Sequence, residues 1–90
     1  MKNTAALLGD EASIWKRVIR PSEKVSQAAA RGLLGLNFHE ADGARMHALV
    51  LKKQQAELTS KEEAELKSYL NVSLVLDLIH AKANHSLPDR

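Results

Sequence analysis

The stretch from Leu58 to Ala83, LTSKEEAELKSYLNVSLVLDLIHAKA, predicts one long helix around which the rest of the chain is arranged. Thr59 and Glu62 have the spacing of a capping box, in which each side chain accepts a hydrogen bond from the other residue's backbone amide. Further along, Leu70 to Ile79 is the densest apolar run of the chain. A helix that is apolar nearly all round is buried on several sides. We therefore expect this helix to form the central spine of the fold.

A first shorter helix is predicted to run from Asp10 to about Ile19. The Asp10 carboxylate can accept from the free amides of the first turn, which makes this residue a good N-cap. Pro21 ends the helix, because the residue before a proline is pushed out of the α region. The helix carries an apolar stripe at alternating spacings of three and four residues. This stripe consists of Leu8, Ala12, Trp15 and Ile19.

Two further helices are predicted in the middle of the chain. Ser22 is expected to cap a helix over Glu23–Leu34, with Gly35 as its C-terminal stop. A third helix is expected to begin near Glu40 and to end near Gln55. Phe38, the only Phe of the chain, lies between these two helices and is expected to anchor the core between them. The chain thus predicts four helices.

The composition supports this assignment to the all-α class. The chain has 90 residues and is 44% hydrophobic, yet it contains one Phe, one Trp and one Tyr. Abundant Ala, Leu, Lys and Glu favour helix over sheet. We expect a small four-helix domain, orthogonal or bundle-like, with a long C-terminal helix. It would be a single domain over residues 1–90, with residues 1–9 as a flexible arm and 86–90 as a tail.

The absence of cysteine suits a reducing compartment and excludes disulfides and thiolate metal ligands. The apolar residues near the N-terminus are too few for the core of a signal peptide. No run approaches the ~20 apolar residues of a membrane span. We therefore expect a cytoplasmic protein without a membrane partner.

The charge distribution raises one alternative function. The net charge is +2, and the basic excess lies in the first 38 residues. It consists of Lys16, Arg17, Arg20, Lys24 and Arg31. Basic side chains contact phosphates in nucleic-acid-binding proteins. No aromatic residues are interleaved with them and no recognition helix is evident, so a solvated basic face is the simpler interpretation. A nucleic-acid-associated protein is the alternative that this cluster leaves open.

The histidines and carboxylates indicate no reaction. No two of the four His residues have the i,i+4 spacing of a helical metal chelate. Asp77 and His80 are spaced i,i+3 and can either form a polar pair on the helix surface or act as two metal ligands, and the polar pair is the simpler interpretation. The acids near the start of the long helix are expected there for capping and for the helix dipole. Glu63 and Lys67 are expected to form an i,i+4 ion pair. No serine lies in a nucleophile elbow. The sequence thus predicts no catalytic residue, no metal, no cofactor and no enzyme activity.

The apolar run from Leu70 to Ile79 has two interpretations, core packing and an interaction surface. It carries more apolar surface than one helix face needs, so part of it can form an interaction groove or a homodimer seam. The candidate partner-binding residues are Tyr69, Val72, Val75, Leu76, Ile79 and Leu51. We expect a non-enzymatic protein-interaction module that acts through the apolar faces of the helices over 40–55 and 58–83. Its partner would be another protein or a second copy of the chain.

Several segments between residues 14 and 87 resemble a group of short helical proteins of planctomycetes and related environmental bacteria. The first matching segments are Ser22-x5-Ala28-Ala29-x-Arg31-x-Leu33-Leu34-x-Leu36-x-Phe38 and Asp42-x2-Arg45-Met46-x2-Leu49. The others are Leu58-Thr59-x2-Glu62-Glu63-x-Glu65-Leu66-x2-Tyr69 and Leu74-x3-Leu78-x3-Lys82-Ala83-x2-Ser86-Leu87. The segment with the capping box and the Lys82-Ala83 ending are the most specific of these matches.

The resemblance implies a small helical module and, by association, a partner. Proteins of this group are encoded next to nuclease genes, notably of the HNH type, which implies an antitoxin, immunity or accessory role with a nuclease as partner. This chain departs from the group at two places. The turn before Leu58 usually carries Gly, whereas here it reads Gln55-Ala56-Glu57. The ending is usually more basic than Ala83-Asn84-His85, and this departure weakens the nucleic-acid alternative.

Overall fold

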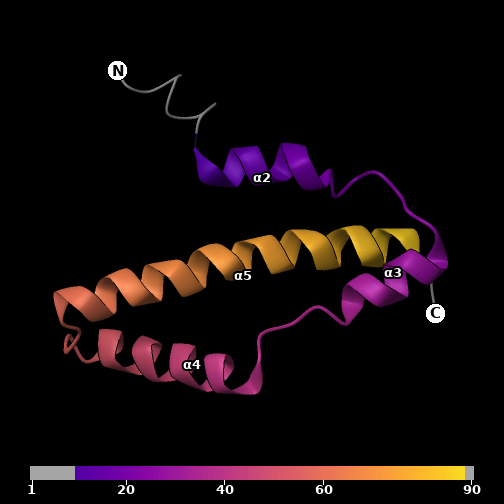
Figure 1. Ribbon diagram of the computed structural model, residues 1–90. Helices are drawn as coiled ribbons and strands as arrows, with labels where there is room; N and C mark the ends of the chain where they lie inside the picture. The colour runs from indigo at the N-terminus through magenta and orange to yellow at the C-terminus, as the bar shows by residue number, and fades with distance from the viewer. Residues whose placement is uncertain (1–9, 89–90) are drawn as a thin grey trace. The chain divides into compact units, whose positions relative to one another are not determined.

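The computed structural model describes residues 10–88, which form four α-helices and no strand (Figure 1). The helices are α2 (Glu11–Ile19), α3 (Gln27–Leu34), α4 (Glu40–Gln54) and α5 (Ser60–Ser86). The predicted all-helical fold with a long C-terminal helix is confirmed. The arm predicted at residues 1–9 lies outside the described residues, as do residues 89 and 90 of the predicted tail.

The chain divides into two compact units, each of which includes part of α5. The hairpin unit, residues 37–73, contains α4 and the first half of α5. The terminal unit contains residues up to 36 together with those from 74 onward, and so holds α2, α3 and the second half of α5. We describe each unit by itself.

In the terminal unit, α2 has the ends that its sequence predicts. The Asp10 carboxylate accepts a hydrogen bond from the Ser13 amide at 2.9 Å, which confirms the predicted N-cap. The last helical residue is Ile19, and Arg20 follows in the left-handed region with φ 54°. Ala12, Trp15 and Ile19 are half-buried, as expected for an inward stripe.

The start of α3 differs from the prediction. The helix begins at Gln27, and its N-cap is Ser26, whose hydroxyl accepts from the Ala29 amide at 3.1 Å. Ser22 was the wrong cap, because the segment before Ser26 is held in a non-helical form. The Glu23 amide donates to the carbonyl of Arg20, and the Val25 amide donates 2.9 Å to the Ser86 hydroxyl of α5. An amide donating outside its own segment is not available for a helical hydrogen bond. Gly35 ends α3 as predicted.

Three side chains from the second half of α5 hold the backbone of the segments that flank α2 and α3. The Lys82 ammonium lies 2.6 Å from the carbonyl oxygen of Ile19 and 3.2 Å from that of Arg20. The His80 ring nitrogen Nε2 lies 2.7 Å from the carbonyl oxygen of Leu36. Ser86 accepts from the Val25 amide, as described above, and donates to the Lys82 carbonyl at 2.8 Å. The terminal unit is therefore tied together by side chain to backbone hydrogen bonds.

The same contacts explain where α5 ends. Asn84 was predicted to end the helix and residue 86 was assigned to the tail, but α5 continues to Ser86, and Pro88 follows its end. Because the Ser86 hydroxyl bonds both Lys82 and the distant Val25 amide, the last turn is held in helical form. Ala83, in the preceding turn, is fully buried, and so is Ala30 of α3.

In the hairpin unit, α4 and the first half of α5 are antiparallel neighbours (Figure 1). The predicted capping box is confirmed: the Glu62 amide donates to the Thr59 hydroxyl and the Thr59 amide donates to the Glu62 carboxylate, each at 3.1 Å. At the start of α4 the N-cap is His39, whose Nδ1 accepts from the Ala41 amide at 3.1 Å. Leu49 of α4 and Leu66 of α5 form the buried core.

Candidate interaction surface

Charged side chains join α4 to α5 along one line, which we call the paired seam: Arg45, Lys52, Glu62 and Glu65. Arg45 makes a two-point contact with Glu65, at 2.9 Å from Nε to Oε2 and 2.8 Å from Nη2 to Oε1. Lys52 donates to Glu62 at 2.6 Å, and Glu62 also lies 3.7 Å from Arg45. Two-point contacts between Arg and a carboxylate fix geometry as well as charge. The paired seam therefore links the two helices on their exposed side.

These contacts shift the ionisation of the seam residues. The hydrogen bond from Arg45 lowers the pKa of Glu65, and the same bond raises the pKa of Arg45. The pKa of Glu62 is lowered first by the hydrogen bond from Lys52 and then by the Thr59 amide. Hydrogen bonds to a carboxylate favour its charged form. Arg45, Glu62 and Glu65 are thus each held in their charged forms by these contacts.

Tyr69 makes the other contacts that connect α5 to residues near the start of α4. The Tyr69 hydroxyl donates a hydrogen bond of 2.7 Å to Asp42, and this bond raises the pKa of Tyr69 because it stabilises the protonated phenol. Its ring meets that of Phe38 edge to face, with centroids 5.9 Å apart. Phe38 was predicted as a core anchor between the second and third helices. It lies half-buried instead, with Tyr69 of α5 as its aromatic partner.

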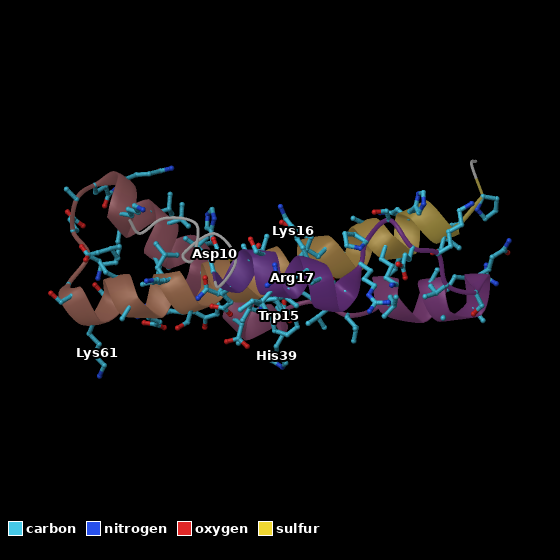
Figure 2. All side chains as sticks on the ribbon, turned by 90° about the horizontal axis from the view of Figure 1, so that it is seen from above. Asp10, Trp15, Lys16, Arg17, His39 and Lys61 are labelled. Atoms are coloured by element: carbon cyan, nitrogen blue, oxygen red, sulfur yellow. The ribbon has the colours of Figure 1, made fainter. Side chains whose placement is uncertain are left out.

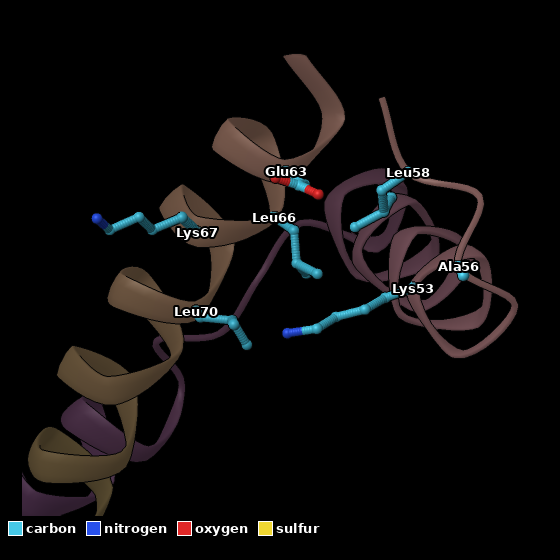
Figure 3. Close-up of a pocket in the computed structure, with 7 residues that line it drawn as sticks. All are labelled: Lys53, Ala56, Leu58, Glu63, Leu66, Lys67 and Leu70. Carbon is cyan, nitrogen blue, oxygen red and sulfur yellow. The ribbon is translucent and has the colours of Figure 1, made fainter. Parts of the chain in front are cut away.

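Two grooves lie among the described residues of the hairpin unit. The first, which we call the Leu70 groove, has a volume of about 570 Å³ and is shown in Figure 3. It is lined by Lys53, Ala56, Leu58, Glu63, Leu66, Lys67 and Leu70. The second, the Tyr69 groove, has a volume of about 400 Å³. It is lined by Phe38, Asp42, Glu65, Ser68, Tyr69 and Val72.

The two grooves lie on opposite sides of α5. Residues 63, 67 and 70 share one helix face, because they are spaced by four and three residues. Residues 65, 69 and 72 repeat this spacing two positions further along, and two residues correspond to about 200° of helix rotation. The hairpin unit therefore presents two separate surfaces.

The predicted partner-binding residues differ in their exposure. Val72 is 48% exposed and Leu51 is 45% exposed. Tyr69, Val75, Leu76 and Ile79 are half-buried. Only Tyr69 and Val72 of this set line a common groove. None of the apolar residues from Leu70 to Ile79 is buried, although the sequence pattern predicts a helix buried on several sides.

Leu70 is an exposed apolar residue outside the set predicted for partner binding. It is 49% exposed and lines the Leu70 groove. The expected ion pair between Glu63 and Lys67 in the same groove is wrong, since the ion pairs of residues 10–88 do not include it. Figure 3 shows Lys67 extending away from the groove and Glu63 pointing toward Leu58. No periodicity of the sequence alone indicates this groove, because the end of α4 forms one of its walls.

The basic cluster that carries the alternative function is exposed in the terminal unit. Lys16, Arg17, Arg20, Lys24 and Arg31 are all exposed. Arg20 lies 3.7 Å from Glu23 and donates to the carbonyl of Arg17. Lys16 extends outward from α2 in Figure 2. Part of the positive charge of the cluster is therefore matched by a carboxylate.

Two of the four histidines have structural partners in the described part of the chain. His39 caps α4 and His80 contacts the Leu36 carbonyl. Asp77, the residue predicted to pair with His80, is exposed. Between residues 10 and 88, no group of three His, Asp or Glu side chains is arranged to hold a metal ion. Within the same range, no helix combines the length and hydrophobicity of a membrane span.

Comparisons with protein-family models, with curated proteins and with solved structures gave no match to this chain. The resemblance to the planctomycete group therefore stays a prediction. The structure does give physical contacts to its most specific residues. The capping box starts α5, and the residues of the Lys82-Ala83 ending, with Ser86, tie α5 to the backbone of the terminal unit.

Proposed function

We propose that this chain is a non-catalytic protein-interaction module that associates through the apolar side chains of α4 and α5. The observation that carries the proposal is the small size of its core. Among residues 10–88, the buried apolar residues are Ala30, Leu49, Leu66 and Ala83. Six larger apolar residues of the same range are at least 43% exposed: Ile14, Val18, Leu36, Leu51, Leu70 and Val72.

The energetic argument follows from this imbalance. A chain of 90 residues buries only about two thirds of its unfolded surface, so its core supports a modest stability. Covering a further ~400 Å² of apolar surface contributes about 10 kcal/mol at ~25 cal/mol per Å² before association costs are subtracted. Leu51, Leu70 and Val72 all belong to the hairpin unit, where the two grooves also lie. This unit is therefore the best candidate for the contact surface.

The partner that we propose is a second copy of the chain, because no other occupant is required to cover these residues. A wider role as an antitoxin-like or accessory protein with a nuclease partner is part of the proposal only through the resemblance. A cytoplasmic location is proposed on the grounds of the cysteine-free sequence.

Thermal unfolding at several protein concentrations tests the proposal. A protein whose folded form associates unfolds at a temperature that rises with concentration. We expect this rise for the full chain, together with binding of the apolar dye ANS at low concentration, where exposed Leu and Val side chains are uncovered. A melting temperature independent of concentration, without ANS binding, would refute the proposal. Duplex DNA binding that weakens with salt and is lost on Lys16→Ala and Arg17→Ala would favour the nucleic-acid alternative instead.

A further inference from the structure

The Leu70 groove differs from the rest of the hairpin unit in its charged residues. Arg45, Lys52, Glu62 and Glu65 all form ion pairs within the chain. Glu63 and Lys67 form none among the described residues, although both line the Leu70 groove. Glu63 is thus available beside the half-exposed Leu70, together with two lysines, Lys67 on α5 and Lys53 on α4.

The order of these residues along α5 makes the surface self-complementary. Glu63 and Lys67 are four residues apart, which places them on one helix face about 6 Å apart along the axis. If a second α5 packs antiparallel on this face, with the two-fold axis at the level of residue 65, Glu63 of each copy faces Lys67 of the other. A two-fold interface repeats each contact, so the arrangement yields two identical ion pairs.

We propose that the Leu70 groove is the site at which two copies of this chain associate, through antiparallel α5 helices with reciprocal pairs between Glu63 and Lys67. This inference rests on the proposed function and names its surface. Leu70 of each copy loses its exposure in the contact, and Leu58 and Leu66 supply the apolar floor beneath it. Lys53, on the wall formed by α4, extends toward Leu70 (Figure 3) and adds a positive charge to the groove.

Competition from within the helix is weak. An exposed i,i+4 pair between Glu63 and Lys67 contributes only a few tenths of a kcal/mol to an isolated helix, and in the structure the two side chains point in different directions (Figure 3). Pairing with a second copy adds to the ion pairs the burial of Leu70, which no intrahelical contact provides. The intermolecular arrangement therefore pairs Glu63 and Lys67 and also buries Leu70.

The Tyr69 groove fits a second copy less well. Its two carboxylates have partners within the chain: Asp42 accepts from Tyr69 and Glu65 binds Arg45. A partner there would have to compete with these hydrogen bonds. Its exposed apolar residue, Val72, has the same exposure as Leu70, at 48% against 49%, and so provides a matched control for the Leu70 groove.

Charge reversal tests the reciprocal pairs. In Glu63→Lys, residues 63 and 67 are both Lys, so positive charges face each other across the contact. In Lys67→Glu, both residues are Glu, so negative charges face each other. Each single variant is therefore expected to self-associate roughly tenfold more weakly than the wild type. The double variant Glu63→Lys/Lys67→Glu restores both pairs and the association. An equimolar mixture of the two single variants also restores them, as a heterodimer. Affinities are measured by sedimentation velocity of the full chain with a fluorescent label.

Two controls make the test specific. Lys61→Glu changes the charge by the same amount, on a side chain that points away from the ribbon in Figure 2, and is expected to leave association unchanged. Circular dichroism checks that each variant remains helical. If a single variant associated weakly because it was misfolded, mixing it with the other variant would not restore association. Restored association in the mixture therefore indicates that the charges of residues 63 and 67 are the cause.

Replacing the apolar residues separates this inference from the proposed function. Leu70→Ser is expected to weaken association by about tenfold, and Val72→Ser is expected to leave it unchanged. If Val72→Ser weakens association and Leu70→Ser does not, or if the single charge reversals associate like the wild type, the Leu70 groove is not the interface although the protein still associates. A wild-type chain that does not associate at all would refute the proposed function as well.

Discussion

The two halves of α5 are held by different kinds of contact. In the hairpin unit, the first half meets α4 through side chain to side chain contacts: the paired seam and the bond from Tyr69 to Asp42. In the terminal unit, the second half uses His80, Lys82 and Ser86 to bind backbone groups of residues 19–36. The ion pairs of the first half depend on pH. The side chains of the second half instead form hydrogen bonds mainly with backbone groups of non-helical segments.

This difference explains why one unit is regular and the other is not. The hairpin unit contains a fifteen-residue α4 that satisfies most of its own backbone hydrogen bonds, so α5 binds it through side chains: the ion pairs, the Tyr69 hydroxyl and the core residues. The terminal unit contains two helices of nine and eight residues, joined by a non-helical segment. Helix ends leave carbonyls without partners, and Lys82 supplies a donor to those of Ile19 and Arg20 at the end of α2.

Removing the core of the hairpin unit should give the largest effect. Leu66 is 3% exposed, and Leu66→Ala is expected to lower the free energy of unfolding by about 2–5 kcal/mol, because it removes buried apolar atoms and leaves a cavity. Urea denaturation measures the loss. Leu70→Ala on the same helix, where the side chain is half exposed, should cost clearly less at protein concentrations too low for association. Equal losses for both variants would contradict the assignment of Leu66 to the core.

The core of the terminal unit should respond to added volume. Ala83 is fully buried, so Ala83→Leu is expected to destabilise the protein by about 1–3 kcal/mol through overpacking. Ala81→Leu is the control, because Ala81 is exposed on the same turn of α5. Urea denaturation of both variants measures the difference. If Ala83→Leu is as stable as Ala81→Leu, the second half of α5 is not packed as described.

The contact between Lys82 and the end of α2 should come next in size. Lys82→Met keeps the length of the side chain but removes the ammonium. We expect a loss of about 1–2 kcal/mol, because the Ile19 carbonyl loses the Lys82 donor and the Arg20 carbonyl keeps only the Glu23 amide. Lys67→Met, on an exposed residue without an ion pair among residues 10–88, should be nearly neutral at low protein concentration. Amide hydrogen exchange at the end of α2 should accelerate in Lys82→Met alone.

Acid should weaken the hairpin unit in a smaller and graded way. Glu62 and Glu65 have pKa values below the ordinary 4.5, so their stabilising contribution is complete above that pH and is lost as the pH falls through the lowered values. The urea midpoint is therefore expected to fall between neutral pH and acid, and to fall less in Glu65→Gln. A midpoint whose acid dependence is unchanged by Glu65→Gln would show that the paired seam is not the cause.

The smallest effects should be the same in both units. Gly32 of α3 and Gly43 of α4 each leave open space where a Cβ would stand, and neither has a positive φ. Gly32→Ala and Gly43→Ala are thus each expected to stabilise the protein by about 0.5–1 kcal/mol, because alanine restricts the unfolded chain. Thermal unfolding measures both. A destabilising result for either would mean that the helix around it packs more closely than described.

Features that depend on neighbouring residues could be predicted from the sequence. Asp10 and the pair Thr59 and Glu62 cap helices through bonds that span three residues, so their spacing is sufficient to identify them. Ser22 and Ser26 both suit an N-cap by type, and the choice between them depends on the Val25 amide, which bonds a hydroxyl 61 residues away. No local pattern contains that contact.

The candidate interaction surface was predicted only in part. The apolar run of α5 predicts an interaction surface and includes Leu70, but the residues predicted for partner binding follow the stripe of Tyr69 and Val72. The groove beside Leu70 depends on where α4 ends and turns back. Ala56 in that turn has φ 57°, a conformation that favours glycine. Nothing in the local sequence shows the groove that this turn closes.

Sedimentation equilibrium of the wild-type chain over micromolar concentrations tests the central claim most directly. The chain has a mass of 9.9 kDa. If the half-exposed side chains of α4 and α5 form a contact between two copies, the apparent mass should rise with concentration toward twice that value. An apparent mass that stays at that of one chain across the whole range would contradict the account.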